Sequence, residues 1–306
     1  MMTGDLMLNV FLANSISLGM MVAVSNTNGT LLASDFNFLT TFFMPGLNAT
    51  LNSEQVSSVL VQILAVLAFM GAGNAMNDIK DAVIDAQAHP NRPIPSQRVS
   101  IQAAQRFVAL LWAFSLAAMA YGSFELSQNN ATWWPLTAIY FCAVILMVTY
   151  DLGPETKSKG LIGNISISLM VAAVILYGAA SVDSMSWLVL YVAGVVFFTN
   201  LAREIIKDCQ DMLADEEVRK TLPMKIGLEN ARMLSYVLIM AGLVCLYIPY
   251  WKGPFVFGQL ILQTPAILVL ISLNGPMFQG QDVQVSARIR VAMLLGLLGF
   301  ILTMYL

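Results

Sequence analysis

Two acidic segments of this chain share one spacing, and that spacing suits metal chemistry. Asp78 is followed by acids three and seven residues later, and Asp208 is followed by acids at the same two distances. Residues at i, i+3 and i+7 share one face of an α-helix, so each segment predicts a ladder of carboxylates roughly 10 Å long. Mg²⁺ prefers carboxylate oxygens and shares its coordination with phosphates. The residues that we expect to hold Mg²⁺ and to act in catalysis are Asp78, Asp81, Asp85, Asp208, Asp211 and Asp215.

The two segments are copies of one pattern. Every matched position lies 130 residues apart, and the match extends to Pro93 and Pro223, each of which follows the last acid of its segment by eight residues. A single acidic cluster is usually a solvated loop. Two clusters in one register, each after an apolar stretch, instead indicate an internal repeat with a shared task.

Composition places these acids in a membrane protein. Of the 306 residues, 58% are hydrophobic and 11% are charged, whereas soluble domains carry about a quarter charged residues. The net charge of −3 provides no basic surface for nucleic acid. The single histidine, His89, and three scattered cysteines disfavour a metal site built on imidazole or thiolate.

The apolar stretches predict an all-α membrane protein. About twenty apolar residues are needed to cross a bilayer as a helix. Nine stretches meet this requirement, and a longer connection over 25–55 separates the first from the second. The expected transmembrane helices are 6–24, 56–76, 101–121, 133–150, 161–180, 185–204, 231–250, 255–273 and 288–306.

Basic residues predict the orientation of these helices. Fourteen of the fifteen lysines and arginines fall in or beside alternate connections, and only Lys252 lies elsewhere. Cytoplasmic connections carry the excess of Lys and Arg in membrane proteins. We therefore expect a multi-pass protein of the cell membrane, with both acidic ladders on the cytoplasmic side, the N-terminus inside and the C-terminus outside.

The repeat divides a single domain of residues 1–306 into two halves. The halves cover about 1–155 and 156–280, and the ninth helix, about 288–306, is left over. Each half contains four helices, and because four is an even number the two halves should run parallel. Both ladders would then lie at one mouth of a helical bundle.

Polar groups near the ladders complete a candidate substrate site. Carboxylates hold Mg²⁺, while Arg and Lys bind phosphate oxygens directly, so a mixture of acids and bases suits a phosphorylated ligand. Tyr150, at the cytoplasmic end of the fourth predicted span, could reach a phosphate or could anchor at the membrane interface. Four asparagines within the spans could orient a substrate or simply bond neighbouring helices; they are Asn14, Asn74, Asn164 and Asn200. The substrate-binding candidates are Asn77, Arg92, Tyr150, Lys157, Lys159, Asn164, Arg203 and Lys207.

These motifs resemble a known family. Asn77-Asp78-x-x-Asp81-x-x-x-Asp85 with Asn91-Arg92-Pro93-Ile94-Pro95-Ser96 is similar to the first signature of the UbiA superfamily of intramembrane prenyltransferases. The second ladder, followed by Lys220-Thr221-Leu222-Pro223, is similar to the second signature, and Gly163-Asn164 also matches. The resemblance implies a UbiA-like bundle, a prenyl diphosphate donor, Mg²⁺ bridging the ladders to the diphosphate, and a membrane-lipid or other acceptor.

The segment Arg203-Glu204-Ile205-Ile206-Lys207-Asp208 is most similar to the archaeal digeranylgeranylglyceryl phosphate synthases of that family. This similarity implies transfer of a geranylgeranyl group from geranylgeranyl diphosphate to the free glycerol hydroxyl of geranylgeranylglyceryl phosphate, in archaeal ether-lipid synthesis. Two alternatives stay open: the same fold acting on an aromatic acceptor of quinone or chlorophyll-type biosynthesis, and a cation transporter that uses the acidic clusters. The sequence does not determine the oligomeric state.

Overall fold

The computed structural model describes residues 53–88, 90–212 and 220–305, and this part of the chain is all-α. It contains eight segments long and apolar enough to cross a membrane. Seven of them are single helices, and the eighth is interrupted. The single helices are α3 (Ser53–Lys80), α5 (Ile101–Gln128), α6 (Trp134–Asp151), α7 (Leu161–Ala180), α8 (Trp187–Gln210), α11 (Leu228–Trp251) and α14 (Asp282–Tyr305).

These eight segments confirm eight of the nine predicted spans. The predicted first span, 6–24, lies outside the described residues, as does most of the connection 25–55. Several helices are longer than expected at the end that carries the acids. The last predicted helix begins at Asp282 rather than at residue 288.

The predicted span 255–273 is not one continuous helix. It consists of the 3-10 helix η3 (Phe257–Gln263), α12 (Thr264–Ile271) and α13 (Asn274–Phe278). Pro265 lies in the first turn of α12 and Pro276 lies within α13. Proline lacks an amide hydrogen and its ring clashes with the preceding turn, so a regular helix does not run through this segment without interruption.

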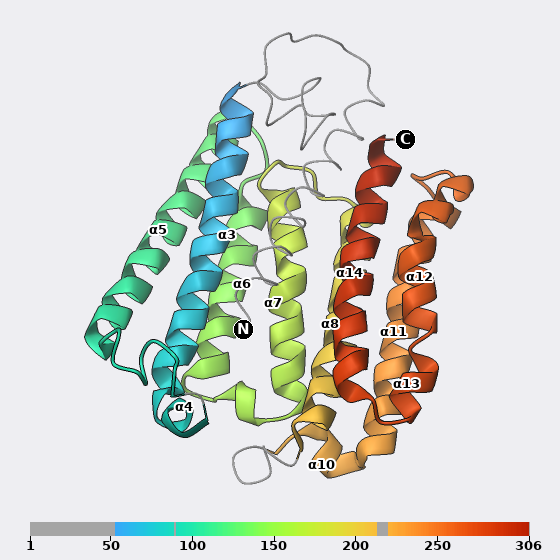
Figure 1. Ribbon diagram of the computed structural model, residues 1–306. Helices are drawn as coiled ribbons and strands as arrows, with labels where there is room; N and C mark the ends of the chain where they lie inside the picture. The colour runs from blue at the N-terminus through green and yellow to red at the C-terminus, as the bar shows by residue number, and fades with distance from the viewer. Residues whose placement is uncertain (1–52, 89, 213–219, 306) are drawn as a thin grey trace.

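The helices α7 and α8 form the centre of the bundle. They bury the largest share of their surface among the described spans, whereas α5 and α6 bury the smallest. In Figure 1, α7 stands between α6 and α8, with α3 and α5 on one flank and α11, α12 and α14 on the other. The most extensive helix contacts are those of α8 with α11 and of α3 with α5.

Buried polar contacts hold α3 to both α5 and α7. The side-chain nitrogen of Gln62 in α3 donates to the backbone carbonyl of Ala118 in α5 at 2.8 Å. The hydroxyl of Tyr177 in α7 donates to the side-chain oxygen of the same Gln62 at 2.6 Å. A Cβ at Gly122 would lie 2.4 Å from the Gln62 side chain, so α5 must carry glycine where it passes this amide. A buried amide needs such partners because unpaired polar groups are costly away from water.

One end of the bundle gathers the short polar elements. These are α4 (Ala82–Ala88), the 3-10 helix η2 (Thr156–Ser158) and α10 (Leu222–Ile226). Figure 1 shows α4 and α10 at the bottom of the view, where α3 and α8 end and α14 begins; α14 then runs to the opposite end. Both acidic ladders therefore lie at the same end of the bundle, and the chain's C-terminal helix ends at the other.

Candidate functional site

The first acidic ladder spans a break between two helices. Asp78 lies in the last turn of α3, Asp81 in the turn that follows, and Asp85 in α4. The Asp81 amide donates to the Asn77 carbonyl at 2.9 Å and the Asp85 amide donates to the Asp81 carbonyl at 2.8 Å. The backbone thus keeps helical bonding through the break. The acids thus continue in helical register from α3 into α4, although the three do not share one partner.

Lys157 pairs with the middle acid of this ladder. Its ammonium, carried by η2, donates to Asp81 Oδ2 at 2.6 Å and to the side-chain oxygen of Asn77 at 2.5 Å. The side chains of Lys157 and Asp81 are only 15% and 20% exposed. Because both charges are largely removed from water, their attraction is less screened than that of a surface pair.

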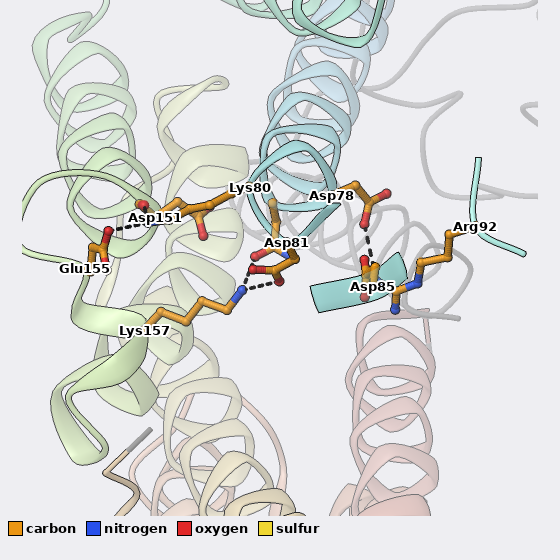
Figure 2. Close-up of polar contacts among 9 residues, drawn as sticks. Asp78, Lys80, Asp81, Asp85, Arg92, Asp151, Glu155 and Lys157 are labelled. Carbon is orange, nitrogen blue, oxygen red and sulfur yellow. Dashed lines mark hydrogen bonds and ion pairs between the residues drawn. The ribbon is translucent and has the colours of Figure 1, made fainter. Parts of the chain in front are cut away.

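Arg92 pairs with the outer acids. Its Nη1 lies 2.5 Å from Asp85 Oδ2 and 3.8 Å from Asp78 Oδ1, and Asp85 is the more buried of the two. Figure 2 shows Asp81 and Lys157 on one side of the ladder and Asp78, Asp85 and Arg92 on the other. Two predicted substrate-binding bases are therefore in direct contact with the predicted metal-binding acids.

Lys80 supports the loop that carries Lys157, a role that the sequence did not reveal. Its ammonium lies 2.8 Å from Glu155 Oε1 and also donates to the backbone carbonyl of Asp151. The hydrogen bond from Lys80, together with its positive charge, holds the pKa of the exposed Glu155 carboxyl below its usual range. The Asp151 side chain is buried, and its Oδ1 has no hydrogen-bond partner among the described residues. The position of Lys80 beside Asp81 was the available signal, but its charge was interpreted as marking orientation.

The second ladder lies at the end of α8. Asp208 Oδ2 accepts a hydrogen bond at 2.7 Å from the side-chain amide of Asn164, in the first turn of α7. Asp211 caps α8, and its amide donates to the Lys207 carbonyl at 2.9 Å. Asp215 lies outside the described residues.

One short segment touches both ladders. Lys157 reaches the first ladder and Asn164, seven residues later, reaches the second. Gly163 makes this possible: a Cβ at that position would lie 2.6 Å from the Thr156 carbonyl and 3.2 Å from the Lys157 Cα. The loop carrying Lys157 therefore packs directly on the turn carrying Asn164, and the two ladders flank a common region.

Two further predicted bases, both on α8, pair with a third acid, Glu204. Arg203 Nη1 lies 2.6 Å from Glu204 Oε1, and Lys207 Nζ lies 3.0 Å from Glu204 Oε2. Sequence reasoning missed Glu204 as a site residue. Its position was a usable signal, because it lies four residues before Asp208 and so extends the acidic face of α8 by one turn.

The remaining candidates are the asparagines of the spans, Tyr150 and Lys159. Asn200 donates to the Ser168 hydroxyl at 3.1 Å and so forms an interhelical hydrogen bond between α8 and α7, as Asn164 does with Asp208. Tyr150 is partly buried near the end of α6, and Lys159 is exposed after η2. Asn74 is partly buried in α3, while Asn14 lies outside the described residues.

The carboxylate oxygens of the two ladders suit Mg²⁺, although no three of the described ones lie close together. Within 53–88, 90–212 and 220–305, no three His, Cys, Asp or Glu side chains form a cluster that could already hold a metal ion. The described acids of both ladders offer only oxygen atoms, as Mg²⁺ prefers. Asp81 and Asp85 already bind cationic groups, the Lys157 ammonium and the Arg92 guanidinium. By chemistry and charge, these residues fit a magnesium ion.

Comparison with known proteins agrees with this geometry. The model of the UbiA prenyltransferase family matches residues 37–276. The digeranylgeranylglyceryl phosphate synthase of Methanopyrus kandleri is 33% identical over 252 residues, which cover 80% of this chain and 87% of that protein. The synthase of the same name from Methanobrevibacter smithii is 32% identical, with 79% and 85% covered.

Solved structures share the fold. One chain from work on digeranylgeranylglyceryl phosphate synthase in membranes superposes with a TM-score of 0.68 at 21% identity, covering 99% of each chain. A UbiA homologue from Archaeoglobus fulgidus, solved with DMAPP and Mg²⁺, superposes with a TM-score of 0.59 at 14% identity, covering 97% of this chain and 99% of the other. The match of the family model over most of the chain, together with these relatives, shows that the protein belongs to the UbiA prenyltransferase family.

Proposed function

We propose that this protein transfers a geranylgeranyl group from geranylgeranyl diphosphate to the free glycerol hydroxyl of geranylgeranylglyceryl phosphate, as a step in archaeal ether-lipid synthesis. The similarity to archaeal synthases of that name, at about 30% identity over most of the chain, supports these substrates. In this reaction the bond between the allylic carbon and the diphosphate oxygen breaks, and an ether bond to the glycerol oxygen forms. The diphosphate leaves with the electron pair, and the hydroxyl proton is released.

The observation that carries the proposal is the segment from Lys157 to Asn164. It contacts Asp81 of the first ladder through Lys157 and Asp208 of the second through Asn164. A diphosphate carries two adjacent phosphoryl groups and requires cations on more than one side. Two acidic ladders joined by one basic loop provide for this, whereas two unrelated surface clusters would not.

The acids of the two ladders and the polar residues around them have distinct tasks in this proposal. The carboxylates of Asp78, Asp81, Asp85, Asp208, Asp211 and Asp215 would hold Mg²⁺, which when bound neutralises the charge that develops on the leaving diphosphate. Asn77, Arg92, Lys157 and Lys159 would bind donor phosphate oxygens. The contacts of Arg92 and Lys157 with the acids would then be exchanged for contacts with phosphate, because a bound metal ion would supply the positive charge that the acids lose.

The acceptor would be bound and oriented mainly by residues of the second half, with Tyr150 contributed by the first. Arg203 and Lys207 would bind its phosphate, Asn164 would orient its head group, and Tyr150 would close the site at the end of α6. Water would intercept the allylic carbon as it gains positive charge, so the site must be dry. The apolar surface of the bundle excludes water and leaves the two prenyl tails in a hydrocarbon environment.

The finer topology also belongs to this proposal. A first helix at 6–24 would complete nine spans, arranged as two parallel halves of about 1–155 and 156–280 with α14 as the ninth helix. The matched pairs α3–α5 and α8–α11 support the repeat, and the distribution of basic residues supports a cytoplasmic active site. Labelling of cysteines introduced at 86–98 and 216–228 should occur from the cytoplasmic side in both cases. Access from opposite sides would refute this topology.

A product assay tests the function. The purified protein is incubated with geranylgeranyl diphosphate, Mg²⁺ and either geranylgeranylglyceryl phosphate or a set of aromatic acceptors, and the product is identified by mass spectrometry. We expect digeranylgeranylglyceryl phosphate, and no product when Mg²⁺ is removed with a chelator. A prenylated aromatic product without turnover of the phosphoglycerol would refute the acceptor and leave the prenyltransferase assignment intact.

A further inference from the structure

Charged residues continue along α8 beyond the acidic ladder, toward the interior of the membrane. Arg203, Glu204 and Lys207 precede Asp208 and lie on the same side of the helix, because positions three and four apart are neighbours on a helical surface. All three belong to a segment that is long and apolar enough to span the membrane. Arg203 lies eight residues, or roughly 12 Å along the helix axis, from Asp211.

These three residues form a closed group, here named the α8 clamp (Arg203, Glu204 and Lys207). Glu204 divides its two oxygens between the cations: Oε1 lies 2.6 Å from Arg203 Nη1, and Oε2 lies 3.0 Å from Lys207 Nζ. The side chains of Arg203 and Glu204 are 14% and 12% exposed, and that of Lys207 is 28% exposed. The Nε of Arg203 is buried and has no hydrogen-bond partner in the described part of the chain.

The α8 clamp is a costly arrangement unless it has a use. Charged side chains within a membrane span are rare, and they usually face a cavity or a substrate path. Helix packing does not require this group, since apolar side chains of similar size would pack α8 without the loss of hydration that buried charges suffer. Two cations and one anion also leave a net charge of +1. The clamp therefore has the composition of an anion-binding site whose anion is provided from outside the chain.

We propose that Glu204 is a positioning residue that holds Arg203 and Lys207 together as a two-cation subsite selecting acceptors with a phosphate monoester. This inference rests on the proposed function, because it assigns the acceptor phosphate to the second half of the molecule. Glu204 does not touch the substrate. It fixes the directions of two long side chains that would otherwise sample many rotamers.

The hydrogen-bonding capacity of the clamp fits this role. A guanidinium has five N–H donors and an ammonium has three. Glu204 engages one group on each side chain, which leaves donors on both for phosphate oxygens. An aromatic acceptor without an anionic group would gain nothing from such a subsite. The clamp therefore discriminates between acceptors by charge, while the ladders serve the donor.

The test separates the KM values of the two substrates. Glu204→Gln keeps the size of the side chain and removes its charge, so the two cations lose their common partner. We expect the KM for geranylgeranylglyceryl phosphate to rise roughly tenfold or more, since hydrogen bonds to charged groups typically contribute that much or more. The KM for geranylgeranyl diphosphate should change less than twofold. Glu229→Gln, at an exposed acid in the first turn of α11, is the matched control and should leave both values unchanged.

A second measurement protects the test from misfolding. Glycerol phosphate should compete with the acceptor in the wild-type protein, and its inhibition constant should weaken in Glu204→Gln by about the same factor as the KM for the acceptor. Glu204→Asp, which keeps the carboxylate, should recover part of the affinity. The inference is wrong if Glu204→Gln lowers kcat while the acceptor KM stays unchanged. It is also wrong if Glu204→Gln changes only the donor KM. If the wild-type protein does not use the phosphoglycerol at all, the proposed function fails instead.

Discussion

The two acidic ladders have the same spacing but different partners. In the first, bases from outside the ladder bind the acids directly: Lys157 binds Asp81 and Arg92 binds Asp85. In the second, the bases on α8 bind Glu204, and Asp208 accepts from the neutral amide of Asn164. The repeated sequence pattern therefore does not place the same charged partners around the two ladders.

This difference arises from where the bases are attached. Lys157 lies on a loop between the two halves, and Arg92 follows α4, so both reach the first ladder through the fold. Lys207 and Arg203 lie on the same helix as the second ladder, roughly one and two turns before Asp211. Under the proposed function, this difference would give the duplicated acidic pattern two substrate sites, one for a diphosphate beside the first ladder and one for a second anion beside the second.

The largest effect should come from removing an acid in either half. Asp81→Ala and Asp211→Ala should each lower kcat by roughly 10²–10³, the range found for groups that stabilise charge in a transition state. Initial rates at saturating Mg²⁺ and substrates provide the measurement, with circular dichroism as a check on folding. Near-normal activity in one variant only would show that a single ladder is sufficient, and the comparison of two metal-binding halves would fail.

Lys157 should be the more important lysine of the loop. Lys157→Met removes the group that bonds Asn77 and Asp81, so kcat/KM for the donor should fall by about tenfold to a hundredfold, typical of lost hydrogen bonds to charged groups. Lys159→Met is the matched comparison, because Lys159 would bind the same diphosphate from an exposed position two residues away, where a charge contributes less than at a partly buried one. We expect a change of less than threefold there. Equal losses in both variants would indicate that the loop acts through its net charge rather than through this contact.

Gly163 tests whether the two ladders depend on one close contact. Gly163→Ala places a Cβ against the Thr156 carbonyl, a backbone atom that cannot move alone. The expected loss is about 1–3 kcal/mol of stability, as for other overpacked sites, together with weaker donor binding. Thermal unfolding in detergent measures the first effect and donor KM the second.

The control for this substitution is Gly275→Ala, because a Cβ at Gly275 would meet no atom within 4 Å. Alanine should be neutral or slightly stabilising there, since it is the better helix former. If Gly163→Ala were equally neutral, the Lys157 loop would not need to pack on α7, and the two ladders would be less tightly coupled than described.

The smallest effect concerns Lys80 and Glu155. Lys80→Met should cost about 1 kcal/mol, because Lys80 also donates to the carbonyl of the buried Asp151. Glu155→Gln should have a smaller effect than Lys80→Met, since Glu155 is exposed and loses only the ion pair. The pKa of Glu155 is lowered in the folded protein, so the pair stabilises the protein above the ordinary carboxyl pKa, and this contribution is lost as pH falls through the lowered value. The difference in Tm between wild type and Lys80→Met should therefore shrink in acid; a constant difference would assign the effect to the Asp151 carbonyl alone.

The sequence alone determined the features that depend on local composition. Eight predicted spans were confirmed because a helix in a bilayer must satisfy its own backbone and needs about twenty apolar residues to do so, and both requirements can be read within one segment. The acidic ladders and the family were identifiable for the same reason, since their spacing is set within a few turns. The interruption of the eighth span at Pro265 and Pro276 was also visible in the sequence, but its consequence for the helix was not predicted.

Only the tertiary structure decided which charges meet. Lys157 and Asp81 are 76 residues apart, and nothing in their local sequence favours this pair over Lys159 or Arg92 with the same acid. Their contact depends on Gly163, whose missing side chain lets η2 lie against α7, and on Lys80, which holds the end of α6 and the loop beyond it. Long-range pairing of this kind follows from how helices pack, and packing depends on the shapes of side chains from several segments at once.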